Sequence, residues 1–280
     1  VQPVVLGSAT FSLTPSIGIA VLGEDATRAR ALLEHAQSAM LEARRNERQG
    51  ISFYSDTLRI RSLARLDVER ELREAIADDQ LALRYHGRYA LQDGRLVAVQ
   101  GYLSWQHPLR GELRASEFLP VADSTGLALT LSRWALRRMR QDLPQLRMLA
   151  GPGLRFSFGA LRQHFSANAL CEDVSSWIAS GEIAAAELEL RIAEKALANL
   201  ASPSATLRAF SKQGVHVIID EYGRGVTSLP KLARLPVAAL QLDRAMVLSA
   251  RSDAVAMKAV RAAVAIAAAL ELPAIAAGVD

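Results

Sequence analysis

Short apolar segments alternate with segments of helical periodicity along most of the chain after residue 80. The apolar segments predict strands near 154–158, 186–192, 215–219, 237–242 and 273–276. The periodic segments predict helices near 116–124, 127–142, 167–180, 193–212, 226–234 and 252–270. Strands that are separated by helices form a parallel sheet covered by helices, and this number of units favours a β/α barrel, like a TIM barrel, over an open sheet.

The first 104 residues have a different organisation. Residues 4–22 read as two short strands, 26–46 as a helix and 51–54 as a closing strand, a block too small for a complete sheet domain. A helix beginning at Ser55 or Asp56 and ending near Asp79 links this block to the rest. Strands at 81–89 and 95–104 flank a turn and predict an antiparallel pair. We therefore expect an α+β fragment at 1–55, a linker helix at 56–79 and a barrel at 80–280.

Composition limits the class of protein. The 33 basic and 29 acidic residues give a net charge of +4 without a charged block, which argues against a nucleic-acid partner. Cys171 is the only cysteine, so an internal disulfide and a multi-cysteine metal site are excluded, and a reducing cytoplasmic location is expected. The most apolar run, Ala262 to Leu270, is too short to span a bilayer, so we expect no membrane insertion by this chain.

Functional residues of a β/α barrel lie at the carboxyl ends of its strands. This rule selects the segment from Gln100 to Ser104, together with Gly159, Arg191, Asp220, Glu221, Gln241, Asp243 and Ala277. Asp220 and Glu221 form an adjacent acidic pair before a loop that contains two glycines. Two interpretations stay open at this stage, a metal or phosphate site and a helix cap with a turn.

Five segments carry a resemblance to a known family. They are QGYLSWQHP at 100–108, EFLP at 117–120, RIAE at 191–194, DEYGRG at 220–225 and QLDR at 241–244. In this order they resemble the motifs of bacterial EAL-domain cyclic di-GMP phosphodiesterases, over roughly residues 66–280, with a barrel truncated at its C-terminal end. The first 55 residues resemble the end of a GGDEF domain, and FimX-type regulators are expected relatives.

The departures from this family change the expected chemistry. The resemblance implies two divalent cations held by carboxylates and an Asn, because hard cations need several charged oxygen ligands. Gln100, Gly159, Arg191, Gln241 and Ala277 stand at positions where the family has ligands or a Lys. We therefore expect no metal, no catalytic residue and no phosphodiesterase activity, with Arg191 paired to Asp220 or Glu221 in place of a metal.

The resemblance also implies cyclic di-GMP as a ligand. The candidate ligand-binding residues are Tyr102, Leu103, Ser104, Glu117, Phe118, Arg191, Asp220, Glu221, Gln241 and Asp243. Tyr102 and Phe118 could stack on guanine, and Glu117 could accept a hydrogen bond from the guanine edge. Ser104 replaces a phosphate-binding Arg of the family, which leaves Arg191 as a phosphate partner. The alternative is that both aromatic rings only pack in the protein.

Two functions remain open. The first is a non-catalytic receptor or adaptor that couples cyclic di-GMP to a protein partner, such as signalling or pilus-type machinery. The second is a pure interaction scaffold that no longer binds the nucleotide. The apolar start of a helix at Val226–Leu229 also suggests a weak homodimer, although ordinary helix packing explains it equally well.

Overall fold

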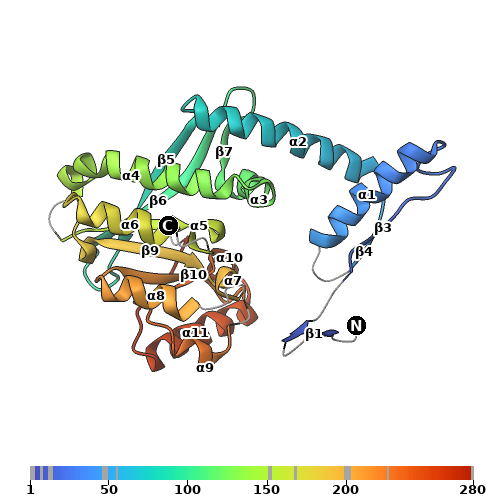
Figure 1. Ribbon diagram of the computed structural model, residues 1–280. Coiled ribbons are helices and arrows are strands. Elements are labelled where there is room, and N and C mark those ends of the chain that lie inside the picture. Colours follow the sequence, from blue (N-terminus) through green and yellow to red (C-terminus); the bar gives the residue numbers. More distant parts are fainter. Residues whose placement is uncertain are drawn as a thin grey trace. The chain divides into compact units, whose positions relative to one another are not determined.

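A computed structural model describes residues 4–6, 9–11, 15–45, 50–54, 56–150, 153–166, 169–198, 203–225 and 227–278. The chain divides into two compact units, Val1–Leu72 and Arg73–Asp280 (Figure 1). Helix α2, Asp56–Ala77, begins in the first unit and ends in the second. No helix within the described part of the chain is long and apolar enough to cross a bilayer.

The described residues of the first unit form two small sheets, helix α1 and the first part of helix α2. Strands β1, Val4–Leu6, and β2, Ala9–Phe11, pair antiparallel, whereas β3, Ile17–Ile19, and β4, Ile51–Phe53, pair in parallel. Helix α1, Ala29–Arg45, packs directly on β3: a Cβ atom at Gly18 would lie 2.0 Å from the carbonyl oxygen of Ala36. The described residues between 4 and 22 therefore form three short strands, one more than the sequence predicted.

The second unit is built on one eight-stranded sheet. Its strands are β5 Leu81–Tyr89, β6 Leu96–His107, β7 Gly111–Arg114, β8 Arg155–Ala160, β9 Leu188–Ala193, β10 His216–Tyr222, β11 Ala239–Leu242 and β12 Ala274–Ile275. The order along the sheet is β12-β11-β10-β9-β8-β6-β5, and β7 pairs with β6 beside this path. All pairs from β6 to β12 are parallel, while β5 and β7 run antiparallel to β6.

The parallel sheet and the antiparallel pair β5–β6 confirm the sequence prediction of a TIM-barrel-like fold, but the described strands do not close into a complete barrel. The sheet is a curled half-barrel whose edges are β5 and β12, and these two strands are not paired with each other. Closure requires hydrogen bonding between the first and last strands, and the two residues of β12 pair only with β11 among the strands described.

Helices follow the strands along the chain (Figure 1). They are α3 Ala115–Thr125, α4 Ala128–Ala150, α5 Arg162–Ser166, α6 Ala169–Ala179, α7 Glu194–Ala198, α8 Pro203–Lys212, α9 Leu229–Leu232, α10 Arg244–Ser249 and α11 Ala254–Ala269, with a 3₁₀ turn at Ala185–Glu187. The helix expected at 193–212 is two helices, because Pro203 lacks the N–H that an uninterrupted helix needs and instead begins α8.

Both faces of the central strands are buried. On β9, Leu188, Leu190 and Ile192 alternate with Glu189 and Arg191, and none of these five side chains is more than 3% exposed. Successive side chains of a strand point to opposite faces, so the buried polar residues share one face of the sheet. The buried core includes Trp105, Trp134 and Trp177. A buried polar face at the strand ends is the setting of the candidate site.

Candidate functional site

Four strands bring a chain of polar side chains together. The amide of Gln100, on β6, donates to Oε1 of Gln241, on β11, at 2.9 Å. The amide of Gln241 in turn donates to Oδ1 of Asp220, on β10, at 2.9 Å. The hydroxyl of Tyr102 donates to Oε1 of Gln100 at 2.8 Å. Residues separated by up to 141 positions in the sequence therefore form one connected network at the strand ends.

Arg191, on β9, supplies the positive charge of this network. Arg191 is only 3% exposed, and its Nη2 donates a hydrogen bond to the carbonyl oxygen of Gly101 at 2.7 Å. Nη1 lies 3.4 Å from Oδ2 of Asp220, which confirms the expected pairing of these two residues. The guanidinium carbon lies 4.4 Å from the centre of the Tyr102 ring, a cation–π contact.

The donors of Arg191 are not all used. Its Nε is buried and has no hydrogen-bond partner among the described residues. The contact from Nη1 to Asp220 is at the long limit for a hydrogen bond. A buried N–H donor without an acceptor lowers the stability of the fold, so its presence needs an explanation. One explanation is that a ligand supplies the missing acceptor.

Glu194 anchors the loop that follows Asp220. Its two carboxylate oxygens accept hydrogen bonds from the backbone N–H groups of Gly223, Gly225 and Thr227 at 2.9–3.0 Å. A Cβ atom at Gly225 would lie 2.6 Å from Cδ of Glu194, so the loop requires glycine there. Burial, together with the charge of Glu194, raises the pKa of Tyr222 at the end of β10.

Glu221 follows Asp220 near the end of β10 and has a strained backbone conformation. Its φ of 54° is in the left-handed region, which non-glycine residues seldom adopt. The pairing of β10 with β11 is irregular at this point, between Ile219 and Tyr222. The carboxylate of Glu221 lies 3.7 Å from Nζ of Lys195, which is 74% exposed at its side chain. Glu221 and Lys195 therefore form a partly exposed ion pair next to Asp220.

The structure corrects the role expected for Phe118. Its residue is 0% exposed, and its ring packs edge-on against Trp105 with 5.8 Å between ring centres. A ring that is buried in the core cannot stack on guanine, so the packing alternative holds for Phe118. Glu117 precedes it on an exposed position and accepts a hydrogen bond from the backbone N–H of Arg114 at 2.7 Å, as a helix-capping residue.

The remaining candidates have structural partners of their own. The Ser104 hydroxyl donates to Glu112, on β7, at 2.5 Å, and Leu103 lies on the other face of β6 from Tyr102. Asp243 accepts from the backbone N–H of Met246 and so caps α10. His107 accepts hydrogen bonds through Nδ1 from the backbone N–H groups of Leu109 and Arg110, which is a structural role.

Sequence reasoning missed Glu194 as a functional residue. The residue ends the segment RIAE at 191–194 and lies before the glycine-containing loop that it holds. The sequence did contain a signal for this role. An acidic residue follows a predicted strand, and a loop with two glycines elsewhere in the chain offers backbone N–H groups that it can bind.

The side chains of the strand-end network do not form a suitable ligand set for a divalent cation. The guanidinium of Arg191 lies beside Oδ2 of Asp220, and Oδ1 accepts hydrogen bonds from the neutral amide of Gln241 and from the backbone N–H of Glu221. Across the described ranges, no three His, Cys, Asp or Glu side chains are grouped as metal ligands. Hard cations need several carboxylate or carbonyl oxygens, so this arrangement favours an anion over a cation.

The sheet and the site define an α/β protein with a buried polar network at the carboxyl ends of parallel strands. Residues 69–280 match the family described as EAL domain. This match spans most of the chain, so the chain belongs to the EAL domain family.

Relatives and solved structures agree with this assignment. The cyclic di-GMP phosphodiesterase NbdA of Pseudomonas aeruginosa is 31% identical over 280 residues, which are 100% of this chain and 36% of NbdA. The structure of the MucR phosphodiesterase of Pseudomonas aeruginosa, in complex with cyclic di-GMP, has a TM-score of 0.72 at 26% identity and covers 76% of this chain and 87% of that one. The FimX EAL domain of Xanthomonas citri, also in complex with cyclic di-GMP, has a TM-score of 0.63 at 22% identity, covers 78% and 85% of the two chains, and shares the fold.

The expectation that this chain is not an enzyme is contradicted, because its relatives NbdA and MucR are named phosphodiesterases. The chain spans only 36% and 41% of the lengths of NbdA and the bifunctional protein MucR. The EAL match begins at residue 69, so the GGDEF resemblance of the first 55 residues stays a prediction.

Proposed function

We propose that the EAL unit binds cyclic di-GMP at the network of Gln100, Arg191, Asp220 and Gln241, and that it passes the bound state to a protein partner. The observation that carries this proposal is the guanidinium of Arg191, buried and fixed at the strand ends with an unused Nε donor. Cyclic di-GMP is named in the complexes of MucR and FimX and in the activity of NbdA, which supports it as the ligand.

Arg191 acts as the cation for a phosphate of the nucleotide. Its short bond to the Gly101 carbonyl keeps the guanidinium in place, whereas the 3.4 Å contact to Asp220 is weak enough for a phosphate oxygen to replace it. Guanidinium groups bind phosphate through two parallel hydrogen bonds, which come either from Nε and Nη2 or from Nη1 and Nη2. In Arg191, Nε is unused and Nη2 has a second N–H besides the one bonded to Gly101. Binding of this kind needs no divalent cation.

A titration with cyclic di-GMP tests this function. We expect saturable binding in calorimetry that is unchanged by EDTA and that weakens about tenfold or more in Arg191→Gln, because a charge-assisted hydrogen bond contributes about 1.5–3 kcal/mol. Arg224→Gln is the matched control, since Arg224 contacts Asp243 from a side chain that is 62% exposed. The same samples are analysed for the linear dinucleotide, because the named activity of NbdA points to turnover.

A protein-interaction scaffold is the second candidate. The observation in its favour is that the side chains of Gln100, Gln241, Asp220 and Arg191 already bind one another. Ser104→Arg adds a second cation to the strand that carries Gln100, and we expect it to tighten binding if the site takes a nucleotide. If neither the native chain nor Ser104→Arg binds cyclic di-GMP at millimolar concentration, nucleotide binding fails and the scaffold function replaces it.

The proposal includes weak self-association at the start of α9. Leu229 is 52% exposed there, while Val226, which belongs to the same predicted surface, lies outside the described residues. Leu229→Asp should abolish any concentration-dependent dimer in sedimentation velocity. A profile that is monomeric at every concentration, in both proteins, would remove the dimer.

A further inference from the structure

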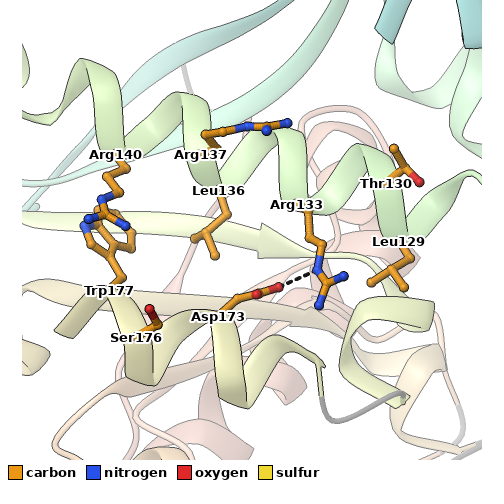
Figure 2. Close-up of a pocket in the computed structure, with 9 residues that line it drawn as sticks. All are labelled: Leu129, Thr130, Arg133, Leu136, Arg137, Arg140, Asp173, Ser176 and Trp177. Atoms are coloured by element: carbon orange, nitrogen blue, oxygen red, sulfur yellow. Dashed lines mark hydrogen bonds and ion pairs between the residues drawn. The ribbon is translucent and has the colours of Figure 1, made fainter. Parts of the chain in front are cut away.

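A groove between helices α4 and α6 lies on different elements from the strand-end network. It has a volume of about 510 Å³, and its lining is part apolar and part charged (Figure 2). Leu129, Leu136 and Trp177 supply the apolar part. Arg133, Arg137 and Arg140 supply the positive charge from α4.

The three arginines share one face of α4, because positions three and four apart lie together on a helix. Arg133 pairs with Asp173 at 2.7 Å, and Arg140 pairs with Glu182. Arg137 is exposed and makes no ion pair with any residue that the structure describes. The groove therefore has two arginines that are already neutralised and one, between them, that is available.

A buried hydrogen-bonded chain fixes one wall of the groove. The Ser132 hydroxyl contacts Nδ1 of His164 at 2.8 Å, and Nε2 of His164 contacts Oδ2 of Asp173 at 2.8 Å. Burial works to raise the pKa of Asp173, but the hydrogen bonds from Arg133 and His164 outweigh it and lower that pKa. Asp173 therefore stays ionised and bound to Arg133, so the groove is formed before any ligand arrives. A preformed site loses less conformational entropy on binding.

We propose that this groove binds an acidic, partly apolar segment of a protein partner, with a carboxylate of the segment on Arg137. Arginine binds carboxylates through two hydrogen bonds, and the apolar lining fits a neighbouring aliphatic side chain. Nucleic acid fits less well, because its affinity depends on many phosphate contacts and the groove offers one unpaired cation. The site is independent of cyclic di-GMP binding, and its test contains no nucleotide.

The probe is a fluorescein-labelled peptide in which Glu and Leu recur among Ser residues, and the measurement is fluorescence anisotropy with the full chain. We expect saturable binding that weakens as salt increases, because exposed charges are screened. Arg137→Glu should weaken binding of this peptide about tenfold and create binding of the peptide in which Lys replaces Glu. The matched control is Arg261→Glu, which makes the same charge change on an exposed position of α11 and should leave binding unchanged.

Several outcomes would overturn the inference. Equal binding of the Glu peptide by the native chain and Arg137→Glu would show that the groove is not the site, as would no saturation with the native chain. Binding of a single-stranded DNA oligonucleotide that depends on Arg137, without binding of the peptide, would assign the groove to nucleic acid. Circular dichroism checks the fold of each variant, and Arg137→Gln replaces Arg137→Glu if the charge reversal unfolds the chain.

Discussion

Replacing Arg191 by Met removes the buried charge of the strand-end network and keeps most of the side-chain volume. The substitution deletes the 2.7 Å hydrogen bond to the Gly101 carbonyl and the contact with Asp220. The carboxylate of Asp220 keeps its hydrogen bond from Gln241 on Oδ1, but its Oδ2 no longer has the guanidinium of Arg191 beside it. The free energy of unfolding should therefore fall.

The size of this loss follows from burial. Removing one partner of a fully buried ion pair costs about 3–5 kcal/mol, because the other charge remains without compensation. The side chain of Asp220 is 22% exposed and keeps hydrogen bonds from Gln241 and from the backbone of Glu221, so solvent and neighbours offset part of that cost. We expect a loss of about 2 kcal/mol for Arg191→Met.

Urea unfolding followed by circular dichroism measures this loss. Adding Asp220→Asn to Arg191→Met should recover most of it, because both charges are then absent. The matched control, Arg224→Met, removes an exposed partner of Asp243 and should cost less than about 1 kcal/mol. The reasoning is refuted if Arg191→Met changes stability no more than Arg224→Met, or if the double variant is no more stable than the single one.

Three further predictions concern the core, the loop and the buried histidine. Phe118→Ala should lower the free energy of unfolding by about 3–5 kcal/mol through an internal cavity, yet leave the affinity for cyclic di-GMP unchanged in calorimetry. Gly225→Ala should cost about 1–3 kcal/mol in urea unfolding, because its Cβ would meet Glu194 at 2.6 Å; an unchanged midpoint would contradict the anchoring of this loop. Burial lowers the pKa of His164, against the opposing effect of its hydrogen bond to Asp173. The unfolded chain therefore binds more protons, and stability should fall as pH decreases through the ordinary histidine pKa of about 6.5. His164→Asn should flatten this pH dependence, and an identical slope in both proteins would contradict it.

The parallel sheet could be predicted because each strand has a local signal in the sequence. Apolar runs such as those of β9 and β10 are bounded by helical segments, and both strands lie where the pattern placed them. Closure of the barrel could not be predicted in the same way, because it depends on whether distant edges such as β5 and β12 meet. Strand β7 was also missed, since β6 continues to His107 before the chain turns back.

The site was predictable in its charges and less so in its aromatic residues. The charge of Arg191 at a strand end required an acidic partner, and Asp220 on the neighbouring strand provides it. Phe118 gave no such signal, because an aromatic residue at a helix start suits both a ligand and the core. Tertiary packing against Trp105 decides between the two.

The final prediction tests whether Arg191 is the group that keeps divalent cations out of this site. Gln100 and Arg191 reach Asp220 from two sides, directly or through Gln241, so glutamates at both positions would bring three carboxylates together. Three carboxylates repel one another without a cation and supply the oxygen ligands that Mn²⁺ binds. The double variant Gln100→Glu/Arg191→Glu should therefore be less stable than the native chain in EDTA. It should gain about 2.7 kcal/mol when Mn²⁺ is present at about 100 times its dissociation constant.

The matched control is Gln100→Glu alone, in which Arg191 can pair with the new carboxylate and no Mn²⁺ binding is expected. Electron paramagnetic resonance of free Mn²⁺ measures binding directly, and urea unfolding measures the linked stability. If the native chain or Gln100→Glu binds Mn²⁺ as tightly as the double variant, Arg191 does not exclude the cation. The guanidinium would then be a structural neighbour of a metal site, and the phosphate contact proposed for it would have to come from another residue.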